Sequence, residues 1–229
     1  MGKEKAHSKI GKGENMESVI EQIQNTGIVP VIVIDDVKDA RPLAKALMEG
    51  GLPCAEITFR TLAAEESIRI ISEEFSNMLV GAGTILNNEQ ADKAIAAGAK
   101  FIVSPGTNKD LIKHCMKKKV LIIPGACTPT EVEMALKYEL SVLKFFPAEP
   151  SGGIEMIKAL NAPYVNVRFM PTGGIKVQNV KDYLAHDKVI ACGGTWMVDR
   201  ELIRKGDFEK IKKLTKEAAE IVKSVRGAK

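Results

Sequence analysis

Ser141-Val142-Leu143-Lys144-Phe145-Phe146-Pro147 is a short, almost continuously apolar stretch, and the repetition of such stretches along the chain decides the fold. Apolar residues that run on without alternating are typical of parallel strands covered on both faces. Each stretch is short enough to be one strand, so we predict a strand at every repeat. Seven further stretches lie at residues 28–34, 54–58, 78–82, 101–103, 120–123, 167–170 and 189–192.

Amphipathic segments lie between these stretches. Residues 40–48 place their apolar side chains on one helix face, and Gly50-Gly51 ends the predicted helix. Thr128-Pro129-Thr130-Glu131 is a capping box with proline at the first helical position, so it starts another helix. Residues 208–225 predict a later helix, and residues 16–24 predict an extra one before the first strand. Strands and helices therefore alternate along the chain.

This alternation, with short loops, predicts a single (β/α)8 TIM barrel of the α/β class with an extra N-terminal helix. We place this domain at residues 14–229 and predict a flexible tail over the polar, lysine-rich residues 1–13. An open doubly wound sheet is the alternative. It would usually carry fewer strands and a glycine fingerprint after the first strand, where this chain has Asp35-Asp36-Val37.

The composition of the 229 residues is that of a globular protein with an aliphatic core, since 45% are apolar and only 5% are aromatic. The net charge of +4 is spread along the chain without a basic stripe that contains aromatic residues, which argues against nucleic-acid binding. No apolar stretch has the length of a signal peptide or a membrane span, so we expect no membrane partner.

The four cysteines and three histidines are widely spaced. The cysteines form no CxxC pair and mostly lie in apolar or glycine-rich runs, which favours reduced thiols over a disulfide framework. The histidines show no metal-ligand spacing, so we predict no metal site. Together these features indicate a cytoplasmic protein.

Lys144 is the only charged residue in the apolar stretch 141–147. An ammonium group in such surroundings loses hydration, which disfavours its charged form. A neutral lysine is a nucleophile that can form a Schiff base with a ketone. Lys144 is therefore a candidate nucleophile.

Active-site groups of a barrel come from the C-terminal ends of its strands. Glu56 and Arg60 share one face of the second predicted strand and its end. An inward carboxylate needs a cationic partner, which Lys144 can supply. The pair is either a buried ion pair that only satisfies both groups or a general base beside an amine, and the cost of charges in a core favours the second. Arg60 suits a substrate carboxylate, although an arginine at a strand end is also a common surface residue.

Two glycine pairs follow the last two predicted strands, in Thr172-Gly173-Gly174 and Gly193-Gly194-Thr195. Glycines let backbone N–H groups approach a phosphate closely, and barrels often bind phosphate at these two loops. A single glycine pair is more often only a turn. Two pairs in adjacent final loops, each beside a hydroxyl residue, favour phosphate binding.

These residues resemble a known family. The stretch Gly51-Leu52-Pro53-Cys54-Ala55-Glu56-Ile57-Thr58-Phe59-Arg60 resembles the glutamate motif of 2-keto-3-deoxy-6-phosphogluconate (KDPG) aldolase, also called 4-hydroxy-2-oxoglutarate aldolase. Leu143-Lys144-Phe145-Phe146-Pro147-Ala148-Glu149 resembles its Schiff-base lysine motif, and the resemblance covers about residues 27–223. Further motifs match in the same order: Gly81-Ala82-Gly83-Thr84, Ser104-Pro105-Gly106, Pro171-Thr172-Gly173-Gly174 and Gly193-Gly194-Thr195-Trp196.

The resemblance implies a class I aldolase, a lyase of Entner–Doudoroff carbohydrate metabolism that uses no metal or cofactor and is usually a homotrimer. Its reaction would cleave KDPG to pyruvate and glyceraldehyde 3-phosphate through a lysine Schiff base. Cleavage of 4-hydroxy-2-oxoglutarate to pyruvate and glyoxylate is a second implied activity. The partners are therefore a phosphorylated keto acid, pyruvate and copies of the chain itself.

By motif match, Lys144 would form the Schiff base and Glu56 would accept the proton. Arg60 and Thr84 would hold the carboxylate of the pyruvate end, and Thr172 would lie near the substrate hydroxyls and influence stereochemistry. The remaining implied substrate-binding residues are Pro105, Gly173, Gly174, Gly194 and Thr195, with the phosphate on Gly173, Gly174 and Thr195.

Two positions depart from the family pattern. Many relatives carry an arginine near the end of the first strand, where this chain has Val33, so phosphate affinity would rest on backbone amides and Thr195. Glu139 stands where the lysine motif usually has glycine, at a predicted helix end, which puts a local turn in doubt.

Other functions stay open on the sequence. One is an aldolase for the phosphorylated galactonate epimer or for the unphosphorylated acid alone, although Thr172 favours the gluconate substrate. Another is a catalytically silent sugar-phosphate sensor or oligomeric scaffold, which has no need for a costly buried amine.

Overall fold

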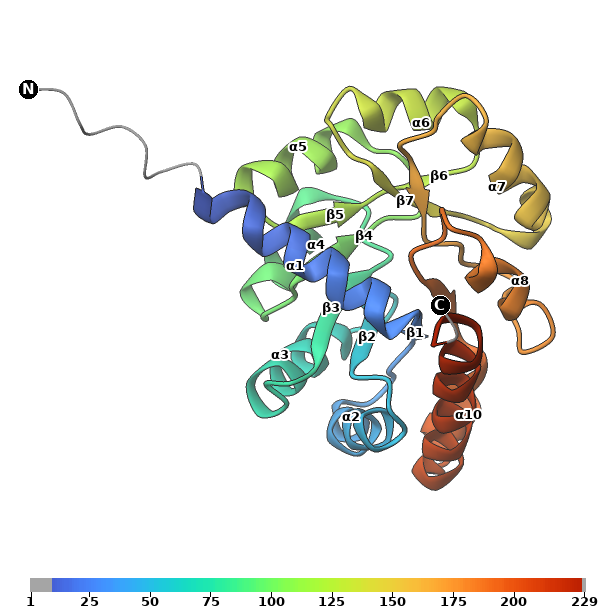
Figure 1. Ribbon diagram of the computed structural model, residues 1–229. Coiled ribbons are helices and arrows are strands. Elements are labelled where there is room, and N and C mark those ends of the chain that lie inside the picture. Colours follow the sequence, from blue (N-terminus) through green and yellow to red (C-terminus); the bar gives the residue numbers. More distant parts are fainter. Residues whose placement is uncertain (1–9, 228–229) are drawn as a thin grey trace, which may run out of the picture.

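Parallel strands surrounded by helices make up residues 10–227, the part of the chain that the computed structural model describes (Figure 1). The strands lie inside and are almost completely buried. They are β1 (Ile28–Ile32), β2 (Cys54–Thr58), β3 (Leu79–Gly83), β4 (Phe101–Val103), β5 (Leu121–Ile123), β6 (Gly125–Ala126), β7 (Val142–Phe145), β8 (Arg168–Phe169) and β9 (Cys192–Gly194).

The strands close into one ring. One sheet runs in the order β5-β4-β3-β2-β1-β9 and the other in the order β6-β7-β8. β6 continues β5 after Pro124, and a parallel bridge between Thr172 and Gly193 joins the chain after β8 to β9. Counting β5 and β6 as one position gives eight positions, which confirms the predicted (β/α)8 barrel.

The last two strands differ from their predicted ranges. The apolar run at 167–170 forms only the two-residue β8, and the run at 189–192 forms β9 only from Cys192 onward. Before β9, Val189 still forms a parallel bridge with Phe169, and the N–H of Ile190 donates to the carbonyl of Phe169. The ring therefore stays hydrogen-bonded where the regular ladder is short.

Helices cover the outside of the ring (Figure 1). The predicted capping box is confirmed, because Thr128 and Glu131 bond each other's backbone N–H groups, and α2 ends before Gly50 as predicted. The α-helices are α1 (Ile10–Thr26), α2 (Ala40–Glu49), α3 (Ala64–Glu74), α4 (Asn88–Ala96), α5 (Lys109–Lys118), α6 (Pro129–Leu136), α7 (Gly153–Asn161), α8 (Val180–Ala185), α9 (Arg200–Arg204) and α10 (Phe208–Arg226). Three 3-10 turns join them: η1 (Val37–Asp39), η2 (Glu149–Ser151) and η3 (Trp196–Val198).

The N-terminal helix α1 closes one end of the barrel, across which it lies in Figure 1. Its buried residues Val19 and Ile23 pack with side chains from the starts of the strands, among them Leu79 and Leu121. The helix begins at Ile10, earlier than the predicted start and within the predicted tail. Residues 1–9 of that tail lie outside the described residues.

The apolar core forms two layers. A large outer layer fills the space between strands and helices, and a smaller inner one fills the barrel beside α1. Phe101 lies in the inner layer against Gly81, where a Cβ would overlap its ring. Because apolar side chains fill this end of the barrel, its polar groups lie toward the carboxyl ends of the strands.

Candidate active site

A buried ion pair occupies the barrel interior. Nζ of Lys144, on β7, lies 3.3 Å from Oε1 of Glu56, on β2. The strands place them there, since Glu56 is in register with Val31 and Gly81 while Lys144 is in register with Gly125. Glu56 is fully buried and Lys144 is 5% exposed. The predicted meeting of these two residues is thus confirmed, in surroundings where each depends on the other for solvation.

Gly83 makes room for the Glu56 carboxylate. A Cβ at position 83 would overlap Oε1 of Glu56 and lie 2.7 Å from its carboxyl carbon. The two residues are neighbours across the β2–β3 ladder, in which Gly83 is in register with Thr58. The position of the carboxylate therefore depends on residue 83 being a glycine, which has no side chain.

Two buried polar atoms near the carboxyl ends of the strands have no protein partner among the described residues: Oε2 of Glu56 and Oγ1 of Thr172. Buried polar atoms are nearly always hydrogen-bonded, so unpaired ones call for an explanation. Thr172 lies beside the lysine strand, because its N–H donates to the carbonyl of Phe145. Both atoms are available to a bound ligand or water.

Arg60 and Thr84 form a second polar pair, at the carboxyl ends of β2 and β3. Nε of Arg60 donates to Oγ1 of Thr84 at 3.1 Å, and Arg60 is exposed. Thr84 has a φ of 57°, a left-handed conformation that costs a non-glycine residue free energy and is found preferentially at functional sites. The pair presents a guanidinium group that can hold a carboxylate in two parallel hydrogen bonds.

Pro105 lies at the carboxyl end of β4, next to the lysine strand. A Cβ at Gly125 would overlap the Pro105 carbonyl, and Gly125 is in register with Lys144. Pro105 is half-buried. It therefore lies at the same end of the barrel as the ion pair.

The loop Thr172-Gly173-Gly174 has an unusual backbone. Gly173 and Gly174 have φ values of 100° and 82°, which side-chain-bearing residues rarely adopt. Within residues 10–227, their N–H groups donate to no protein acceptor. Unpaired N–H groups in such a turn form an anion-binding concavity.

Gly194 and Thr195 end the neighbouring loop. A Cβ at Gly194 would overlap the Trp196 ring, so only glycine fits there. Thr195 is exposed and directly precedes η3. The bridge between Thr172 and Gly193 brings this loop beside the first glycine pair. The structure thus brings the predicted phosphate-binding residues together.

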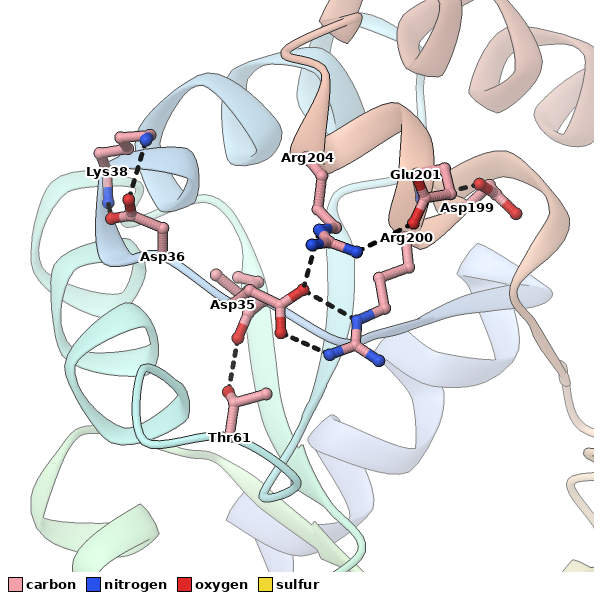
Figure 2. Close-up of polar contacts among 9 residues, drawn as sticks. Asp35, Asp36, Lys38, Thr61, Asp199, Arg200, Glu201 and Arg204 are labelled. Carbon is pink, nitrogen blue, oxygen red and sulfur yellow. Dashed lines mark hydrogen bonds and ion pairs between the residues drawn. The ribbon is translucent and has the colours of Figure 1, made fainter.

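Ion pairs and a hydrogen bond at the carboxyl ends of the strands join the segments after β1 and β2 to α9 (Figure 2). The Asp35 carboxylate, after β1, accepts from Nε and Nη2 of Arg200 at 2.8 and 2.6 Å. Nε of Arg204 lies 4.0 Å from the same carboxylate. Thr61 donates to the carbonyl of Ile34, so the residue after Arg60 is held against the same loop. The hydrogen bonds from Arg200 hold the pKa of the Asp35 carboxyl below its usual value, although desolvation by burial opposes this.

Phe146 is a residue that the sequence did not single out. Nζ of Lys144 lies 5.1 Å from the centre of its ring, within the range of a cation–π contact. A signal was present, because Phe146 follows Lys144 by two residues in the same apolar stretch. The ring borders the amine on one side.

A large cavity lies elsewhere. Its volume is about 780 Å³, and it is bordered by residues of α1 and α10 and by the start of β3. The Arg226 guanidinium beside it donates to the carbonyls of Gln24, Val189 and Ile190, so its hydrogen-bonding capacity is largely used. The reactive groups are at the other end of the barrel, and we place the site there.

Residues 10–227 contain neither a metal-binding cluster nor a membrane-spanning helix. No group of three or more His, Cys, Asp or Glu side chains in this range could hold a metal ion. None of the helices there is both long and apolar enough to span a bilayer.

Comparison with known proteins shows which family this chain resembles. The family model described as "Aldolase: KDPG and KHG aldolase" matches residues 19–214. KHG denotes the 4-hydroxy-2-oxoglutarate named above. A 2-dehydro-3-deoxy-phosphogluconate aldolase of Treponema pallidum is 48% identical over 207 residues, which cover 90% of this chain and 99% of that protein.

Two solved structures share the fold. The KDPG aldolase of Zymomonas mobilis, crystallised with 3-phosphoglycerate, has a TM-score of 0.84 and 40% identity, covering 89% of this chain and 96% of its own. The Legionella pneumophila enzyme, with pyruvate captured at low pH as a covalent carbinolamine intermediate, has a TM-score of 0.84 and 36% identity. That match covers 87% of this chain and 97% of the Legionella chain.

Proposed function

Because this chain belongs to the KDPG and KHG aldolase family, we propose that it cleaves KDPG to pyruvate and glyceraldehyde 3-phosphate through a Schiff base on Lys144. It is a lyase of the class I aldolase type. The observation that carries the proposal is the buried pair of Lys144 and Glu56, with Nζ and Oε1 3.3 Å apart. An amine nucleophile beside a carboxylate base is what Schiff-base chemistry requires.

The reaction begins with the attack of the Lys144 amine on the C2 ketone. Glu56 carries protons as the carbinolamine loses water and becomes an iminium ion. Deprotonation of the C4 hydroxyl breaks the C3–C4 bond, and the bonding electrons move into the iminium to give an enamine. Glyceraldehyde 3-phosphate leaves. Protonation of the enamine at C3 and hydrolysis then release pyruvate and regenerate the amine.

Arg60 and Thr84 hold the carboxylate beside the ketone. The guanidinium and the hydroxyl are already bonded to each other at 3.1 Å, so the pair is organised before substrate arrives. Holding the ketone in near-attack geometry lowers the entropic part of the barrier. The strained backbone of Thr84 supports this role.

Thr172 and Pro105 border the middle of the substrate in this proposal. The unpartnered hydroxyl of Thr172 would bond a substrate hydroxyl, which ties it to the choice between epimers. The phosphate would rest on Gly173, Gly174 and Thr195, with Gly194 beside them in the second loop, and the two loops adjoin. Val33 is half-buried after β1 and carries no charge, so this part of the site relies on backbone N–H groups.

Borohydride trapping tests the proposal. Incubation with pyruvate and sodium borohydride, followed by peptide mass spectrometry, should place one reduced pyruvyl adduct on Lys144. Lys144→Ala should abolish the adduct and turnover while the protein stays folded, and the exposed Lys113→Ala should keep both. Cleavage that survives Lys144→Ala, or an adduct on another lysine, would refute the assignment. The kcat/KM values for the gluconate and galactonate epimers would then identify the natural substrate.

We further propose that the protein is a homotrimer whose interfaces contain two exposed leucines. Leu62 is fully exposed and Leu86 is more than half exposed, and they follow Arg60 and Thr84 by two residues in the sequence. Exposed apolar side chains that form a contiguous patch mark an interaction surface, and we propose that these two leucines belong to one. Light scattering should give three times the chain mass, and Leu62→Lys with Leu86→Lys should lower it. A monomeric unaltered protein would contradict this proposal.

A cytoplasmic location is the remaining part of the proposal. All four cysteines are free, and Cys54, Cys115 and Cys192 are buried. Free thiols in such number fit a reducing compartment. Fractionation of the source cells should recover the protein with cytoplasmic markers, and recovery with a membrane or secreted fraction would contradict this.

A further inference from the structure

Glu149 and Tyr183 form a polar pair behind the glycine loop. Glu149 lies five residues after Lys144, at the start of η2, and its Oε1 accepts a hydrogen bond from the hydroxyl of Tyr183 on α8. The reaction described above uses neither residue.

The chain around Glu149 is bonded directly to the glycine loop. The N–H of Ala148 donates to the carbonyl of Thr172 at 2.8 Å, and the N–H of Glu149 donates to the carbonyl of Gly173 at 3.0 Å. A Cβ at Gly174 would lie 2.6 Å from Cβ and Cγ of Glu149. The glycine loop therefore packs against both the backbone and the side-chain stem of Glu149.

The buried ring of Tyr183 fixes the other end of the pair. Tyr183 is 1% exposed and belongs to the outer core layer, so its hydroxyl has little freedom to move. Desolvation by burial, together with the nearby Glu149, raises the pKa of the phenol far above its usual value. The phenol thus stays protonated and remains a hydrogen-bond donor. It anchors the exposed carboxylate of Glu149, which otherwise would rotate freely.

A second anchor holds the far side of the loop. Nδ2 of Asn179 donates to the carbonyl of Gly174 at 3.1 Å, and Oδ1 of Asn179 accepts from the N–H of Lys176. Gly174 is thereby clamped between Glu149 and Asn179, while its own N–H has no acceptor among residues 10–227.

We propose that Glu149 and Tyr183 are positioning residues that hold the Gly173-Gly174 loop in its phosphate-binding shape. The pair would then determine how much the substrate's phosphate contributes to binding affinity. The inference rests on the proposed function, because it takes this loop as the phosphate site. It adds that phosphate recognition depends on two side chains that do not touch the phosphate.

The test compares a phosphorylated and an unphosphorylated substrate. In Tyr183→Phe and Glu149→Ala, the KM for KDPG should rise by about five- to tenfold, the size expected for one lost hydrogen bond. The KM for 4-hydroxy-2-oxoglutarate and the yield of borohydride trapping with pyruvate should stay within about twofold, since neither involves a phosphate. Glu149→Gln keeps an acceptor for the phenol and should restore most of the KDPG affinity.

Tyr164→Phe is the matched control. Its hydroxyl donates to Oε1 of Glu133 at 3.0 Å on the exposed surface of α6, so the same chemistry is removed elsewhere. This variant should behave like the unaltered protein with both substrates. The double variant of Tyr183→Phe and Glu149→Ala should be little worse than either single one, because one interaction is lost in all three.

The outcomes separate the two proposals. Turnover of KDPG by the unaltered protein tests the proposed function, and the KM ratio between substrates tests the positioning role. An equal loss for both substrates, or no change for KDPG, would overturn the positioning role. If Tyr183→Phe fails to fold, the exposed Glu149→Ala and Glu149→Gln variants still decide the question.

Discussion

Gly83 lies directly against the carboxylate of Glu56, so that a single methyl group at position 83 would occupy the space of Oε1. The two residues belong to adjacent strands, β3 and β2. The absence of a side chain at one position therefore determines where the charge of the other sits. That charge in turn lies 3.3 Å from the amine of Lys144.

Gly83→Ala should displace Glu56 from Lys144. Because a misplacement of about 1 Å in catalytic geometry can cost about a hundredfold in rate, we expect kcat to fall by roughly that factor. Gly106→Ala is the control, since a Cβ at Gly106 meets nothing within 4 Å. Steady-state kinetics measures both variants, and circular dichroism checks that they fold. Full activity in Gly83→Ala would show that Glu56 need not keep this position.

Thr172→Val should separate function from stability. The Thr172 hydroxyl is buried without a protein partner, so its removal should leave the free energy of unfolding unchanged or slightly raised. Loss of its bond to the substrate should lower kcat/KM for KDPG by about tenfold, which corresponds to ~1.4 kcal/mol. Urea unfolding and kinetics on the same preparation measure the two effects. A variant that loses stability and keeps its kcat/KM would reverse this interpretation.

Glu139→Gly should stabilise the protein. Glu139 follows α6 with a φ of 59°, so the turn that was in doubt is formed with a left-handed glutamate in place of the family's glycine. That conformation costs a non-glycine residue roughly 1–2 kcal/mol, and the entropy of glycine in the unfolded chain offsets roughly 0.5–1 kcal/mol of the gain. Urea unfolding should show a net gain of roughly 0.5–1 kcal/mol. Glu139→Ala keeps the strain and should show no such gain.

Glu131→Gln should make stability less dependent on pH. Desolvation opposes ionisation of Glu131, but hydrogen bonds from Cys127 and Thr128 outweigh it and hold the pKa of this carboxyl below its usual value. An acid whose pKa is lowered by folding stabilises the protein above its unfolded pKa of about 4.3, and this contribution is lost as pH falls through the folded value.

Glutamine keeps an oxygen that can accept the capping hydrogen bonds but lacks the charge, so at pH 7 the Glu131→Gln variant should lose roughly 0.3–1 kcal/mol, the usual size of a charge effect at a helix N-terminus. Near pH 3 the difference from the unaltered protein should become small. Urea unfolding at both pH values measures it, with Glu133→Gln on the same helix as the control. A difference that grows on acidification would contradict the assignment.

The sequence predicted most of the barrel because its strands are buried on both faces and therefore apolar throughout. The meeting of Lys144 and Glu56 also followed from the sequence, since inward polar residues at strand ends converge in a barrel. The start of α1 was wrong, because Gly11 and Gly13 disfavour a helix locally and the predicted tail covered them. The part of α1 that packs against the barrel, with Val19 and Ile23 buried, lies within the predicted range.

Apart from the contact between Lys144 and Glu56, contacts between distant side chains could not be predicted. The overlap that excludes a Cβ at Gly83 depends on the register of two strands. The bond between Tyr183 and Glu149 depends on how α8 packs. Such relationships require coordinates because the register of the strands and the packing of the helices determine them, and neither follows from a local sequence pattern.

The closure of the ring has a consequence for how the enzyme becomes active during synthesis. Glu56 is on the second strand position and Lys144 on the sixth, and the ring closes only when β9 pairs with β1. A nascent chain that has folded only its first half contains Glu56 but not yet Lys144, so the catalytic pair is incomplete. Catalytic competence should therefore appear late and all at once, so that the first turnover reports the completion of folding.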